Sequence, residues 1–83
     1  MPLYMDIHKV GQKIDPKEVA EAHKKDLEVQ DKHGVRFLRY WYDEATGKVF
    51  CLAEAPDPEA TIAVHREAHG LLADEIVEVR EGG

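Results

Sequence analysis

The residues of this chain best suited to chemistry are histidines and carboxylates at short spacings. Asp6 and His8 are two residues apart, and His65 and His69 are four residues apart. Residues two apart on a strand project from the same face, so Asp6 and His8 can act together. Residues four apart on a helix are neighbours, and two imidazoles at this spacing can hold one metal ion. These four side chains are the first candidates for a metal site.

His23 and Asp26 form a further pair, at the centre of the arc of a predicted helix that lies opposite its charged solvent face. An unpaired buried polar group costs about 1–3 kcal/mol, so both side chains need partners. One interpretation is that they satisfy each other inside the core, together with Tyr40 or Tyr42. The other is that His23 is a metal ligand. His8 and His69 also have explanations that need no metal. A strand end in solvent would explain His8, and a solvated helix face would explain His69.

The charge of the chain favours a cation as ligand. The net charge is −6, and residues 43–83 carry 3 basic and 10 acidic side chains. Nucleic-acid binding is not expected, because it depends on Lys and Arg that neutralise phosphates. Imidazole and carboxylate ligands suit nickel, zinc, copper and cobalt alike, since these ions differ mainly in preferred geometry.

Other kinds of site find little support in the sequence. Cys51 is the only cysteine, which excludes an internal disulfide and a zinc site built from several cysteines. It alternates with Val49 and Ala53, and we expect it to point at the helices as a small apolar residue. There is no glycine-rich phosphate loop, nucleophile elbow or dinucleotide fingerprint, so no catalytic or organic-cofactor residue is assigned.

The elements that must position these residues alternate in type along the chain. Strand patterns cover residues 3–8, 35–42, 48–54 and 75–80, and helix patterns cover 15–33 and 58–69. Asp15-Pro16 and Asp57-Pro58 are typical helix starts, and Gly34 and Gly70 are typical helix ends. The order βαββαβ predicts an α+β, ferredoxin-like fold, with a four-stranded antiparallel sheet and both helices on one face. A chain this short is expected to form a single domain, residues 1–83.

The second face of such a sheet is open, and we expect a homodimer in which two sheets pack as an α/β barrel. That face is expected to carry Tyr4, Asp6 and His8, with alternate residues of the strand 35–42. Mixed aromatic and ionisable lining is typical of a ligand cavity. No apolar run approaches the roughly 20 residues needed to cross a bilayer, and the first residues do not resemble a secretory signal. A cytoplasmic location without membrane contact is therefore expected.

Several segments together resemble a known family of small bacterial nickel-binding proteins, classed as a domain of unknown function. The segments are Met5-Asp6-x-His8, Ala22-His23-x-x-Asp26-Leu27, Gly47-x-Val49-x-Cys51-Leu52-x-Glu54-Ala55-Pro56, His65 and Ala73-Asp74-Glu75-Ile76. The resemblance implies a ferredoxin-like fold, a dimer and nickel binding, with no established catalytic activity. It places Asp6, His8, His23, Asp26 and His65 at the family's recurring polar positions, whereas His69 remains a candidate by spacing alone.

Three functions follow from these observations. The first is a nickel-binding protein for storage, buffering or metal response, with metal candidates Asp6, His8, His23, His65 and His69. The second is a small dimeric α/β-barrel enzyme, in which Asp6, His8 and a tyrosine act as acid and base on a small organic molecule. The third is an interaction module whose histidines are core and surface residues. The sequence favours the first, and with it a protein that is not an enzyme.

Overall fold

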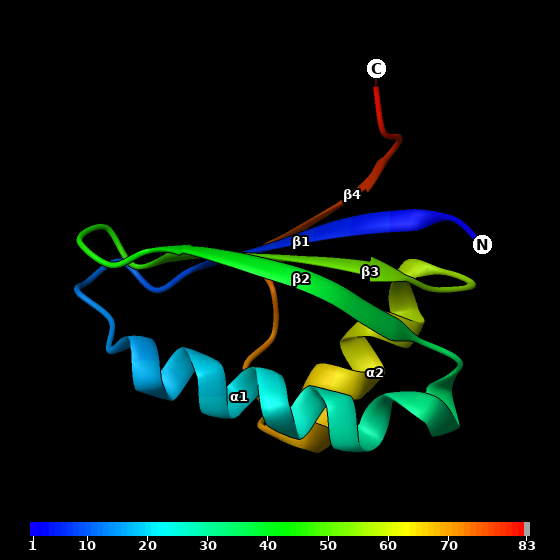
Figure 1. The fold of residues 1–83 in the computed structure, drawn as a ribbon, viewed down its shortest axis with the longest axis horizontal. Helices are drawn as coiled ribbons and strands as arrows, with labels where there is room; N and C mark the ends of the chain where they lie inside the picture. Colours follow the sequence, from blue (N-terminus) through cyan, green and yellow to red (C-terminus); the bar gives the residue numbers. More distant parts are fainter. Residues whose placement is uncertain (83) are drawn as a thin grey trace.

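The computed structural model describes residues 1–82, which build a four-stranded antiparallel sheet with two helices on one face (Figure 1). The elements are β1 (Leu3–Lys9), α1 (Pro16–Val29), the short 3-10 helix η1 (Gln30–His33), β2 (Arg36–Asp43), β3 (Lys48–Glu54), α2 (Pro58–Ala68) and β4 (Glu75–Val79). The strand order is β2-β3-β1-β4, and every neighbouring pair is antiparallel. The predicted α+β, ferredoxin-like fold is confirmed.

The helix ends form as the sequence predicts. An Oδ1 atom of Asp15 accepts a hydrogen bond from the Lys17 backbone N–H, and Asp57 accepts one from Ala60, both at 2.9 Å. These side chains satisfy N–H groups that have no partner within the helix. Gly34 ends η1 with φ of 69°, a left-handed conformation that glycine adopts without strain. Both helices therefore begin where the sequence predicts, whereas the last residues of the first predicted helix, Gln30–His33, form a 3-10 helix and not an α-helix.

The predicted orientation of the first strand is wrong. Tyr4 and Asp6 are buried on the face that packs against the helices, and His8 follows them on that side. The open face instead carries Met5 and Ile7. Alternation determines which residues share a face, but not which of the two faces the helices cover. The Asp6 carboxylate is accommodated on the buried face because His65 of α2 bonds to it at 2.8 Å.

The second strand does not alternate regularly. The register shifts between Phe37 and Arg39, so Phe37 and Tyr40 both lie on the helix-facing side, opposite Ala53 and Cys51. Regular alternation predicted that one face would carry either Phe37, Arg39 and Trp41 or Leu38, Tyr40 and Tyr42, and the shift makes both sets wrong. An extra residue of this kind is a β-bulge, which locally bends and twists a strand.

The core between sheet and helices is small and contains polar groups. Its apolar part includes Val35, Phe37, Ala53 and Val64, each at most 5% exposed. Thr61 is also buried, and its hydroxyl donates to the Pro58 carbonyl at 2.7 Å. No helix of residues 1–82 is long and apolar enough to cross a membrane.

Candidate metal centre

A buried network of ion pairs is centred on His65 of α2. Its Nε2 atom lies 2.8 Å from Asp6 Oδ2, and its Nδ1 atom lies 2.9 Å from Asp26 Oδ1. His65 and Asp6 are 1% exposed, and Asp26 is 3% exposed. A buried carboxylate without a partner would be strongly destabilising, so each of the two depends on the imidazole between them.

Two further histidines complete the network from opposite sides. His8 Nε2 donates to Asp6 Oδ1 at 3.0 Å, and His69 Nε2 lies 2.9 Å from Asp26 Oδ1. The backbone N–H of Leu71 donates to His69 Nδ1 at 3.0 Å. Since Nδ1 acts as an acceptor, the proton of a neutral His69 lies on Nε2 and points at Asp26.

Each side chain reaches the network because of its place in an element. Asp6 and His8 are two residues apart on β1 and share its inner face. Asp26 is the only fully buried residue of α1, at the centre of the arc predicted to face the sheet. His65 and His69 lie one turn apart at the end of α2. Three elements distant in sequence thus converge on one point.

The network shifts the proton affinities of its members. Burial raises the pKa of Asp6, but hydrogen bonds from His65 and His8 outweigh it and lower that pKa to about 2. Burial likewise opposes ionisation of Asp26, whose pKa is nevertheless lowered by His65 and His69. For His65, burial lowers the pKa and the two carboxylates raise it to about 9. Without metal at neutral pH, His65 is therefore an imidazolium between two carboxylates.

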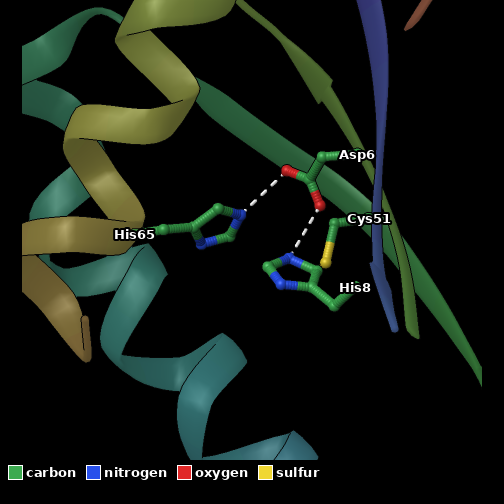
Figure 2. A group of neighbouring side chains, drawn as sticks. All are labelled: Asp6, His8, Cys51 and His65. Carbon is green, nitrogen blue, oxygen red and sulfur yellow. Dashed lines mark hydrogen bonds and ion pairs between the residues drawn. The ribbon is translucent and has the colours of Figure 1, made fainter. Parts of the chain in front are cut away.

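Cys51 lies beside this network on β3, directly opposite Asp6 of β1. Figure 2 shows its sulfur next to His8 and close to the Asp6 carboxylate. It is 6% exposed, and burial together with the Asp6 charge raises the pKa of its thiol. The expectation that Cys51 points at the helices as part of the core is confirmed, but it also lies against the polar side chains of Asp6, His8 and His65.

The donor atoms form two groups that share His65. In the first, which we call the inner group, one ligand atom each from Asp6, His8, Cys51 and His65 lies within 4.8 Å of the others. In the second, the outer group, the same holds for Asp26, His65 and His69. Imidazole, carboxylate and thiolate are the ligands preferred by borderline metals such as nickel and zinc. The donor set therefore fits such an ion.

His23 belongs to neither group, although the sequence made it a metal candidate. Its ring packs on Tyr40, with a centroid distance of 4.6 Å, and its buried Nδ1 atom has no hydrogen-bond partner within residues 1–82. The expected pairing of His23 with Asp26 is also wrong, because the Asp26 carboxylate bonds to the histidines of α2. Burial lowers the pKa of His23, which keeps this imidazole neutral.

The simpler explanations for His8 and His69 are also wrong. His8 does not end its strand in solvent, since its side chain is 12% exposed. His69 was expected on a solvated helix face, but its side chain is 7% exposed. His65 is 1% exposed and is the largest fully buried side chain of residues 1–82. In each case the reason is that Asp6 and Asp26 face inward and attract the imidazoles.

A cavity of about 550 Å³ adjoins both groups, between α1, the sheet and the segment that follows α2. His8, His65 and His69 line it, together with Asp26 and Cys51. Much of the remaining wall is apolar and includes Ile14, Val19, Val49, Leu71 and Leu72. The network is thus reachable from one side despite its burial.

Comparison with known proteins gives one family and one structure. The profile of a family described as "Nickel responsive protein SCO4226-like" matches residues 4–79. The crystal structure of SCO4226 from Streptomyces coelicolor A3(2) is similar, with 38% identity and a TM-score of 0.90. The similarity covers 98% of this chain and 99% of that one. No curated protein matches the chain.

Proposed function

This chain belongs to the SCO4226-like family of nickel-responsive proteins, and on that basis we propose that it binds nickel through the buried histidine–carboxylate network. The role would be storage, buffering or response to metal in the cytoplasm rather than catalysis. The observation that carries the proposal is that two groups of metal-ligating atoms share His65. A net charge of −6 also favours accumulation of a cation.

The proposed ligands are Asp6, His8 and His65 from the inner group, with Asp26 and His69 as the outer alternative. Three donors are fewer than the four to six that these metals take, so further ligands come from water or other protein atoms. A metal would replace the proton on at least one imidazole nitrogen, because only a neutral imidazole offers a lone pair. Nickel affinity should therefore rise with pH.

Titration calorimetry with nickel, together with metal content by mass spectrometry, tests the proposal. His65→Gln removes the residue shared by both groups and should abolish stoichiometric binding. His33→Gln is the matched control, because His33 lies outside the network and bonds to Glu67 on the surface. Absence of nickel binding in the wild type, or equal binding in both variants, would contradict a role for this network.

We further propose that the protein is a homodimer in which two open sheet faces pack together. That face carries Met5, Ile7, Phe50 and Leu52, with Trp41 and Val77 at 47% and 45% exposure. Exposed apolar surface of this extent is unfavourable in a monomer. Light scattering should give twice the chain mass for the wild type and the monomer mass for Trp41→Arg. A monomeric wild type would refute the dimer and leave the metal proposal intact.

The cavity supports a second candidate function, binding of a small organic molecule. Its volume of about 550 Å³ lies within the range typical of ligand pockets and exceeds what one metal ion occupies. It lies beneath the helices and not on the open face where the sequence placed it. Ala22→Phe should fill the cavity, whereas Ala20→Phe changes an exposed position of the same helix. A co-purifying organic molecule retained by the second variant and lost from the first would favour this function.

A further inference from the structure

We propose that Cys51 is a metal ligand of the inner group, as a thiolate. This inference rests on the proposed nickel binding and makes it more specific. It gives the site a sulfur donor, which distinguishes the inner group from the outer group, where all donors are nitrogen and oxygen. The sequence alone assigned Cys51 to the apolar core, so the proposal depends on where the fold places this side chain.

The position of Cys51 is set by the pairing of β1 with β3. Asp6 and Cys51 are direct cross-strand partners, and both point toward the helices. His8 is two residues further along the same face of β1, and its ring lies 4.9 Å from that of His65, centroid to centroid. The sulfur and one donor atom of each of these three residues lie within 4.8 Å of one another. Figure 2 shows all four around a common centre.

The surroundings of Cys51 leave metal binding as its most suitable chemistry. At 6% exposure it is inaccessible to a second cysteine, and the chain contains no other. It also lines the cavity, so an ion that enters there can reach the sulfur. When the metal binds, the S–H bond breaks, an S–metal bond forms and the proton leaves to solvent, without any electron transfer.

A thiolate in the donor set has a consequence for selectivity. Sulfur ligands favour nickel, zinc, cobalt and copper over magnesium, calcium and manganese, which prefer oxygen. The inner group should therefore exclude the abundant hard cations even though the protein is acidic. The outer group offers one carboxylate and two imidazoles, which also suit nickel, zinc and copper but supply no sulfur donor.

The test is absorption spectroscopy of the full chain titrated with nickel or cobalt, which gives thiolate-to-metal charge-transfer bands in the near ultraviolet. We expect such a band in the wild type and in His33→Gln, because His33 lies outside both groups and bonds to Glu67 on the surface. We expect no band in Cys51→Ser, and nickel binding about tenfold weaker or more. Because a core variant can misfold, X-ray absorption of the zinc-loaded wild type provides a second measurement: a sulfur neighbour lies at about 2.3 Å, against about 2.0–2.1 Å for nitrogen.

The outcomes separate this proposal from the one on which it rests. A charge-transfer band and a sulfur neighbour in the wild type support Cys51 as ligand. Stoichiometric nickel binding with nitrogen and oxygen neighbours alone would overturn the role of Cys51 and leave the proposed function standing. No binding of nickel, cobalt or zinc by the wild type would overturn both.

Discussion

Raising the pH in the absence of metal should destabilise this protein, because His65 then loses the proton that it shares with two buried carboxylates. The Asp6 and Asp26 carboxylates raise the pKa of His65 from 6.5 to about 9 in the folded state. Since the folded pKa lies above the unfolded one, the stabilisation is fully present below pH 6.5. It is lost as the pH rises through about 9.

The size of the loss follows from the shift in pKa. One pKa unit corresponds to about 1.4 kcal/mol, so the shift of His65 predicts a loss of roughly 3 kcal/mol. Small domains have total stabilities of about 5–15 kcal/mol. The loss is therefore a large fraction of the total and is measurable. The raised pKa of His65 and the lowered pKa of Asp6 arise from the same ion pair, so its stabilisation is counted once.

The measurement is urea unfolding with a chelator present, at a series of pH values from below 6.5 to about 9. The wild type should lose stability with the slope expected for release of one proton. His65→Gln should remove this slope, whereas His33→Gln should retain it. Nitrogen-15 NMR of the imidazoles gives the pKa of His65 directly in the same samples.

Two results would refute the reasoning. One is a His65 pKa at or below its ordinary value of 6.5, which would mean that burial outweighs the two carboxylates. The other is an unchanged pH dependence in His65→Gln, which would assign the lost proton to a different group.

Three further predictions concern single positions. Below pH 3.8 the metal-free protein should lose stability as the pH falls toward 2, because two histidines lower the pKa of Asp6 to about 2. Asp6→Asn should reduce this loss in chemical denaturation, and the part that remains belongs to groups such as Asp26, whose pKa is also lowered. Asp26→Asn should lower the free energy of unfolding by about 3 kcal/mol, since it leaves a buried imidazolium with one carboxylate fewer. Gly47→Ala should destabilise by more than about 1 kcal/mol in thermal unfolding, because φ is +77° and a Cβ would clash with the Gln12 carbonyl oxygen. Gly11→Ala is the control and should cost less, because φ is +80° but no atom lies within 4 Å of the added Cβ.

The order and ends of the elements were predictable because their signals are local. Asp15-Pro16 and Asp57-Pro58 specify helix starts through the bonds that each aspartate accepts. Gly34 specifies a chain reversal through its φ angle. The strands follow from alternation and from β-branched and aromatic content. Given that order, the handedness and adjacency rules leave few topologies other than the ferredoxin-like one.

The membership of the site was predictable only in part, because it depends on long-range packing. Asp6, His8, His65 and His69 were found from spacing, and all four lie in the network. Placing Asp6 on the inner face required knowing which side of β1 the helices cover, and the alternation of residue types does not determine that side. Once Asp6 and Cys51 are known to be cross-strand partners, both must share a face. His23 has the same residue type and a similar helix position as His65, but α1 directs it at Tyr40.

The bulge in β2 has a consequence for how this strand tolerates changes in length. Phe37 and Arg39 pair with Ala53 and Leu52, so Leu38 is the residue without a direct partner on β3. Deleting Leu38 would leave Phe37 and Tyr40 on their present side with regular alternation. Deleting any single residue between Tyr40 and Asp43 would instead exchange the two sides for the rest of the strand. Relatives with a shorter second strand are therefore expected to align with their gap at residue 38, and circular dichroism of the two deletion variants would distinguish the tolerated site from the disruptive one.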